Sequence, residues 1–192
     1  MIYGPLAATF GPTELFNFDF EEYVDGANWS ETGWNSGVNW KIYDDMGDNI
    51  IYPSSANEWW NTYDVALSNV VMIAGIKESN SNTLSGVVAR YLNNSNFLLL
   101  EAVRNESKVK MYIRQSGTWS LLDETDANIS FLNESVIEYR IECKGNTILG
   151  FRNNVQVTSA ILVGSELLGT QVGIYCGTSQ PNFSYMSATT AP

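Results

Sequence analysis

Apolar and polar residues alternate with a period of two through most of the chain. The pattern is clearest between Lys108 and Gln115, where apolar side chains are flanked by charged or polar ones. In an extended strand, successive side chains point to opposite faces, so this alternation predicts a half-buried β-strand. The residues expected to face inward are Val109, Met111 and Ile113, and those expected to face outward are Lys108, Lys110, Tyr112 and Arg114.

Similar strand patterns recur at close spacing, with Asn, Gly and Ser turn signals between them. From Ser85 to Leu92 the alternation places Val87, Ala89 and Tyr91 on one face and Val88 and Arg90 on the other. The stretch from Asn96 to Arg104 is apolar on both faces, which predicts a strand at the centre of a sheet. One segment, Ala160 to Leu168, has the pattern of a short helix, although Gly164 disfavours it.

About a dozen short strands with little helix are typical of an all-β fold, here a two-sheet antiparallel sandwich. The 192 residues suffice for one domain, and no apolar run reaches the ~18 residues of a membrane-spanning helix. Residues 1–14 carry two Gly-Pro breaks and no period, so we expect an N-terminal arm there, followed by one domain over residues 15–192.

Several segments, in this order, resemble the concanavalin A-like lectin/glucanase superfamily, especially laminin-G-like jelly rolls and domains related to family 16 glycoside hydrolases. They are FNFDFEEYVDGANW, GVVARYLNNSNFLLLEAV, KVKMYIRQSGTWSLL, YRIECKGNTILGFRNNVQV and VGIYCGTSQPNFSYMSA. The resemblance covers roughly residues 15–190 and implies a jelly-roll fold. It does not select a function, because this fold hosts lectins, enzymes and packing modules.

Two departures from the superfamily pattern concern chemistry. Its glucanases carry Glu-x-Asp-x-x-Glu on one strand, whereas this chain has Glu138-Tyr-Arg-Ile-Glu142 without the Asp. We interpret Glu138, Arg140 and Glu142 as a solvated ladder of ions. Relatives often have Phe-Asp near the C-terminus where this chain has Phe183-Ser184, so one carboxylate that could bind calcium is missing.

Charge and composition narrow the chemistry further. The net charge is −11, and an acidic surface repels phosphate backbones and anionic lipids, so we expect neither nucleic acid nor a membrane as a partner. The chain contains no histidine, which removes Ser-His-Asp and Cys-His catalysis and zinc sites that need imidazole. Cys143 and Cys176 fall on apolar strand faces and are interpreted as buried free thiols, with a single disulfide as the alternative.

Aromatic residues gather in the acidic first third of the chain, where five of the six tryptophans lie. Aromatic rings cover the flat C–H faces of sugars, and Asp and Asn bind the hydroxyls, so the mixture favours glycan binding. If Trp59 and Trp60 are in a strand, they face opposite sides, whereas Trp34 lies in a glycine-flanked loop. Trp40 and Trp119 are expected in the core.

Glu101 is a carboxylate on the otherwise apolar strand face of Phe97, Leu99 and Val103. It could pair with Arg90 or Arg104, contact a ligand, or act as a catalytic acid with a raised pKa. Tyr112 points outward among cations and could stack with one of them or line a concave sheet face. The candidate carbohydrate-binding residues are Trp34, Trp59, Trp60, Arg90, Glu101 and Tyr112; no catalytic residue is assigned.

No metal ligand or cofactor is predicted. The acidic turn from Asp44 to Asp48 lacks the length and the closing Glu of an EF-hand loop, so we interpret it as a solvated loop. A structural calcium ion stays open as an alternative.

These observations lead to two hypotheses. The first is a non-catalytic, lectin-like structural protein that contacts glycans. Its N-terminus has no secretory signal pattern, so we expect display on a virion surface, such as a bacteriophage tail or capsid, with the arm contacting other virion proteins. The second is a carbohydrate-binding module or a glycoside hydrolase-like enzyme acting on polysaccharide, with Glu101 as the carboxylate to test.

Overall fold

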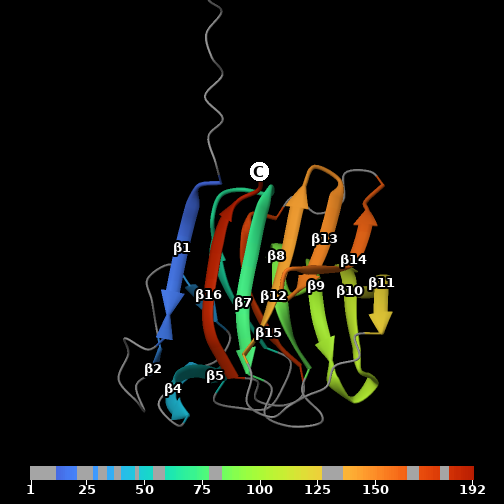
Figure 1. The fold of residues 1–192 in the computed structure, drawn as a ribbon. Coiled ribbons are helices and arrows are strands. Elements are labelled where there is room, and N and C mark those ends of the chain that lie inside the picture. The colour runs from blue at the N-terminus through green and yellow to red at the C-terminus, as the bar shows by residue number, and fades with distance from the viewer. Residues whose placement is uncertain are drawn as a thin grey trace, which may run out of the picture.

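The computed structural model describes residues 12–20, 28–29, 34–36, 40–45, 48–53, 59–77, 84–126, 136–163, 169–177 and 182–192. Within these residues the chain forms two antiparallel sheets that pack face to face (Figure 1), so the predicted all-β sandwich is confirmed. The helical structure described is 3-10: the segment Arg104–Glu106 and a 3-10 residue at Phe20.

The first sheet has nine strands among the described residues. Their order across the sheet, with β1 (Glu14–Asp19) also pairing with β16, is β14 (Val155–Ile161), β13 (Thr147–Arg152), β12 (Val136–Lys144), β7 (Val70–Lys77), β16 (Asn182–Thr190), β5 (Asp48–Pro53), β4 (Trp40–Asp45) and β2 (Asn28–Trp29). Because β7 pairs with β12 on one side and with β16 on the other, the sheet brings together segments that are distant in sequence, the last strand included.

The second sheet has seven strands in the described part of the chain. Their order is β11 (Thr118–Asp126), β10 (Lys108–Gln115), β9 (Asn96–Val103), β8 (Leu84–Asn93), β15 (Gln171–Cys176), β6 (Trp59–Asp64) and β3 (Trp34–Ser36). Strand β9 has neighbours on both sides and is buried from Phe97 to Val103, which confirms the predicted sheet centre.

The main core lies between the sheets and contains the inward residues of both. The predicted alternation in β10 is confirmed, because Val109, Met111 and Ile113 are buried and their neighbours are more exposed. Trp40 is fully buried and its ring centroid is 5.9 Å from that of Phe183, so this tryptophan is a core residue as expected.

Two predicted boundaries differ from the structure. Thr13 and Glu14, assigned to the arm, pair with the last strand: Thr190 N donates to Thr13 O at 2.9 Å, and Glu14 opposes Thr189. Residues 1–11 of the predicted arm lie outside the described residues. Ala160 and Ile161, assigned to a short helix, end strand β14, because the backbone of each is paired with β13. Residues 164–168 of that predicted helix lie outside the described residues.

Candidate functional site

A second apolar cluster lies on the face of the seven-stranded sheet that points away from the nine-stranded sheet. Val88, Phe97, Leu99 and Tyr175 are buried in it. Their sequence neighbours, such as Leu98 and Ile174, belong to the main core, as strand alternation requires. The central strands of the seven-stranded sheet, β8, β9 and β15, are therefore apolar on both faces.

Six of the eight residues in this cluster are aromatic, and we call these six the aromatic face. Each of these rings lies 5.3 to 5.8 Å, centroid to centroid, from at least one other ring in the set. Phe97 and Tyr175 are buried, whereas the other four are half-buried and keep part of their surface in contact with solvent. The residues are Trp60, Tyr91, Phe97, Tyr112, Trp119 and Tyr175.

Glu101 lies in a hollow of about 310 Å³ at one end of the aromatic face, which we call the Glu101 hollow. Its other lining residues are Tyr112, Trp119 and Tyr175. Glu101 itself is only 7% exposed. Gly86 lies between Glu101 and Tyr175 in the strand register and has no side chain to fill this part of the face. Burial, and then the negative charge of Glu101, raise the pKa of Tyr112.

The site offers polar groups as well as rings. The indole Nε1 of Trp60 is buried, and within the described residues it has no hydrogen-bond partner. The Arg114 guanidinium lies 5.0 Å from the centroid of the Trp119 ring, and its Nε donates to Gly117 O at 3.3 Å. Because Trp60 Nε1 is buried, the groups that this site presents to a ligand are flat apolar rings and one carboxylate acceptor.

Arg90, a predicted site residue, points away from this face. Its Nε donates to Ser68 O at 2.9 Å and its Nη2 donates to Gly145 O, both belonging to segments that adjoin strands of the nine-stranded sheet. Arg90 is 3% exposed, and its charge acts on the Cys143 thiol in that sheet. We therefore correct the prediction: Arg90 links the two sheets, and it neither lines the aromatic face nor pairs with Glu101.

The cause is a β-bulge that the alternation did not predict. Arg90 has a φ of 50°, and the pairing of β8 with β9 shifts between Ala89 and Asn93. Ala89 lies in the main core and Arg90 also points to that side, whereas Tyr91 returns to the face of Val88. The prediction that Tyr91 shares a face with Val87 and Ala89 is therefore wrong.

The structure brings three of the six predicted site residues to one face: Trp60, Glu101 and Tyr112. Trp34 lies in β3 and pairs through its backbone with Tyr63, and Trp59 lies in β6 and pairs with Cys176. Their side chains fall outside the described residues.

Trp119 differs from the expectation of a core residue, because it is half-buried on the aromatic face. The signal was present in the sequence. A two-residue turn at Ser116-Gly117 pairs Arg114 with Trp119, so an outward Arg114 requires an outward Trp119. Tyr91 and Tyr175 were also missed, Tyr91 because of the bulge.

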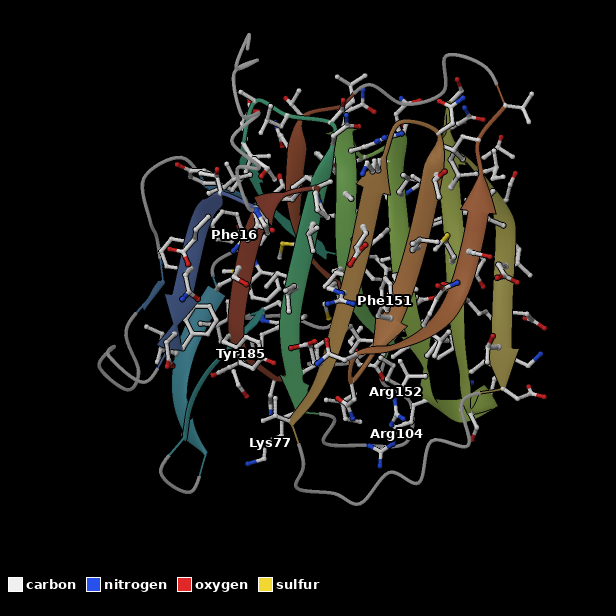
Figure 2. All side chains as sticks on the ribbon, turned by 45° about the horizontal axis from the view of Figure 1, so that its top comes forward. Phe16, Lys77, Arg104, Phe151, Arg152 and Tyr185 are labelled. Carbon is white, nitrogen blue, oxygen red and sulfur yellow. The ribbon has the colours of Figure 1, made fainter. Side chains whose placement is uncertain are left out.

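Glu138, Arg140 and Glu142 lie on the opposite surface of the molecule, the outer face of the nine-stranded sheet. Arg140 Nε is 3.2 Å from Glu142 Oε1 and its guanidinium lies 4.0 Å from the centroid of the Phe151 ring, while the Tyr185 hydroxyl donates to Glu138 at 3.3 Å. Figure 2 shows Phe151 and Tyr185 on two strands of this sheet. These contacts agree with a structural ladder of ions.

Both cysteines are buried free thiols, one in each sheet, which confirms the first interpretation over a disulfide. Burial raises the pKa of each thiol to about 12. Among the described residues, no three His, Cys, Asp or Glu side chains form a group that could hold a metal ion. The side chains of the turn from Asp44 to Asp48 are not among those described. No helix in the described segments has the length and apolarity to cross a membrane.

No protein-family model matches the sequence, and no curated protein sequence matches it either. Solved structures do match the fold. Carbohydrate-binding module CBM66 from Bacillus subtilis superposes with a TM-score of 0.63 at 14% identity, covering 82% of this chain and 95% of that one.

Glycoside hydrolases are also among the similar structures. A family 16 endo-glucanase from Bacteroides ovatus gives a TM-score of 0.64 at 9% identity, covering 91% of this chain and 99% of that one. The β-glucanase of Bacillus licheniformis gives a TM-score of 0.61 at 12% identity, covering 96% of this chain and 100% of that one. At these identities the likeness concerns the fold. The chain therefore has the jelly-roll fold that the resemblance predicted, and it shares this fold with these structures.

Proposed function

We propose that the protein is a non-catalytic carbohydrate-binding module whose binding surface is the aromatic face. The observation that carries the proposal is the juxtaposition of a cluster of aromatic rings, four of them half-buried, with the Glu101 hollow. Rings of Trp and Tyr pack on the apolar faces of sugars, and a carboxylate accepts hydrogen bonds from their hydroxyls. A volume of about 310 Å³ is at the small end of the range for ligand sites.

The composition of the hollow supports binding rather than hydrolysis. Glycoside hydrolysis generally needs two carboxyl groups flanking the scissile bond, about 5 to 9.5 Å apart. Among the described lining residues of the Glu101 hollow, one is acidic. The carbohydrate-binding module among the similar structures fits this proposal, and the glucanases fit the alternative of an enzyme.

The test begins with a glycan array, followed by calorimetric titration of the glycan with the highest signal. Trp119→Ala removes a half-buried ring from the aromatic face, so we expect a loss of affinity of about tenfold or more. Phe151→Ala, which removes a half-buried ring from the opposite surface, is the matched control and leaves affinity unchanged. Equal losses in both variants, or no binding to any glycan, contradict the proposal.

Glu101→Gln separates binding from catalysis because the amide keeps the shape of the side chain. We expect weaker binding and no release of shorter sugars from the bound glycan by either protein. Turnover by the wild-type chain that Glu101→Gln abolishes, with the fold intact by circular dichroism, would establish the hydrolase instead.

Display on a virion surface, with the arm contacting other virion proteins, stays a prediction from the sequence. Its test is the identity of the neighbouring genes and the presence of the protein in purified particles. Flanking genes for polysaccharide degradation, with no particle-associated protein, contradict it.

A further inference from the structure

A second hollow, of about 560 Å³, opens at the end of the aromatic face opposite to the Glu101 hollow. Its lining comes from the turn between β8 and β9 and from the start of β15, and we call it the amide hollow because carboxamide side chains dominate it. The lining residues are Tyr91, Leu92, Asn93, Asn94, Ser95, Asn96 and Gln171.

The two hollows are joined by a continuous path of aromatic rings. The Tyr112 ring centroid is 5.7 Å from that of Trp119, which is 5.3 Å from that of Phe97. Phe97 in turn lies 5.8 Å from Tyr91, and these two rings are stacked with an interplanar angle of 28°. Phe97 is fully buried, so the parts of this path that reach the surface are the half-buried rings of Tyr112, Trp119 and Tyr91. Tyr112 and Trp119 line the Glu101 hollow and Tyr91 lines the amide hollow, so a ligand that reaches both hollows crosses these rings.

The amide groups are held so that donors remain for a ligand. Asn94 Oδ1 accepts the Tyr91 hydroxyl, and Gln171 Oε1 accepts the Thr62 hydroxyl at 2.8 Å. Each oxygen is thereby used within the protein, and the nitrogen of each carboxamide is the group left to donate. Two such donors beside the ring of Tyr91 suit the hydroxyls and the apolar face of a sugar.

The turn is also fixed before any ligand binds. Asn93 Oδ1 accepts Ser95 N at 2.9 Å, and Asn96 Oδ1 accepts Ser116 N from the neighbouring hairpin at 3.0 Å. Gly117 N donates to Ser95 O at 3.0 Å, which joins the two hairpin turns a second time. Preorganisation of this kind reduces the entropy lost on binding.

We propose that the binding site continues from the Glu101 hollow along β9 to the amide hollow and therefore takes an extended glycan chain rather than a single sugar. Five residue steps separate Glu101 from Asn96, which corresponds to roughly 17 Å along a strand. The centroids of the aromatic rings are spaced 5.3 to 5.8 Å apart. If one sugar unit takes up one such spacing, a strand length of roughly 17 Å accommodates about three sugar units. The inference rests on the proposed function, because it assigns the ligand class of the same face.

The test is calorimetric titration with a series of oligosaccharides, from one sugar to six, built from the glycan that the array identifies. Affinity is expected to rise with chain length up to about three units and then to level off. Asn94→Asp keeps the acceptor for Tyr91 but removes the donor, so it should weaken binding of the longer chains by about threefold to tenfold and leave the single sugar unaffected. Asn146→Asp, at an exposed turn of the nine-stranded sheet, adds the same charge and should change neither affinity.

The outcomes separate the two proposals. A single sugar that binds as tightly as the longer chains, or equal affinities of Asn94→Asp and the wild type for every length, overturns the extended site. If Trp119→Ala still weakens the single sugar in that case, the proposed function stands alone. No binding at any length overturns both.

Discussion

At the scale of single residues, the two charged groups that the sequence singled out have opposite roles. Glu101 and Arg90 are both almost fully buried. Glu101 lies on β9 and Arg90 on the neighbouring strand β8 of the same sheet. Glu101 opens into a hollow among aromatic rings, whereas the two donors of Arg90 hold backbone carbonyls across the sandwich. Residue type and strand position alone did not distinguish them, because the difference is set by the φ angle of Arg90.

Replacement of Arg90 by Met tests its structural role. The change removes two charge-assisted hydrogen bonds and leaves Ser68 O and Gly145 O without that donor, so we expect the free energy of unfolding to fall by roughly 2–3 kcal/mol. Urea denaturation measures it. Unchanged stability combined with weaker glycan binding would instead return Arg90 to the binding surface, where the sequence had predicted it.

At the scale of elements, hairpins were predictable and the bulge was not. Alternation located the faces of β10 and β12, because both strands are regular and half-buried. The same rule failed in β8 after Ala89, since β8 has one extra residue relative to β15 between Val88 and Tyr91, which returns Tyr91 to the face of Val88. Nothing in the local sequence Val88-Ala89-Arg90-Tyr91 indicates this irregularity, because its partners lie in segments distant in sequence, at Ser68, Gly145 and Gly169.

Gly169 is expected to be required for the bulge. A Cβ at this position would lie 2.4 Å from Arg90 O and 2.6 Å from Tyr91 O, which are backbone atoms that cannot rotate away. Gly169→Ala should therefore lower the free energy of unfolding by roughly 1–3 kcal/mol and, by moving Tyr91 relative to Phe97, change the near-ultraviolet circular dichroism spectrum.

The control for Gly169 is Gly145→Ala. A Cβ at Gly145 would meet no atom within 4 Å, so its cost of about 1 kcal/mol comes from the positive φ of 54° alone. This variant should leave the near-ultraviolet spectrum unchanged. A Gly169→Ala protein as stable as the wild type, with the same spectrum, would show that the bulge does not depend on this close approach.

At the scale of the whole molecule, the two sheets enclose a core in which both thiols are kept from water. Burial raises the pKa of Cys143 and of Cys176 from 9.0 to about 12. Below pH 9 the thiols are protonated in the folded and unfolded states alike, so they have no effect on the pH dependence of stability. Between pH 9 and about 12 the unfolded chain loses these protons and the folded chain keeps them, so the folded state becomes less stable as pH rises.

We therefore expect the free energy of unfolding to decline above pH 9, by about 1.4 kcal/mol per pH unit for each thiol. Urea denaturation at a series of alkaline pH values measures the slope. Replacement of both cysteines by alanine should make the slope smaller. Tyr185, whose pKa burial raises to about 12, contributes to the slope that remains. An equal slope in the two proteins would mean that the thiols are accessible to water in the folded state.

The fold was predictable from the sequence, but the site was predictable only in part. Turn residues and alternating apolar positions are local features of the sequence, and about a dozen strands marked by them are enough to indicate a sandwich. The site depends on which outward residues of separate strands become neighbours, as Glu101 of β9 and Tyr175 of β15 do across Gly86 of β8. That register between distant segments follows from the packing of the whole sheet. The similar structures include binding modules and hydrolases, so the function depends on such residues rather than on the fold.

The most direct test of the central claim is a crystal structure of the protein with an oligosaccharide selected on the array. The account predicts a sugar ring lying against Trp119 or Tyr112, with a hydroxyl within hydrogen-bond distance of a Glu101 carboxylate oxygen, and a chain that continues toward Asn94. A sugar bound on the outer face of the nine-stranded sheet, or a sugar flanked by two carboxylates at hydrolytic separation, would contradict it.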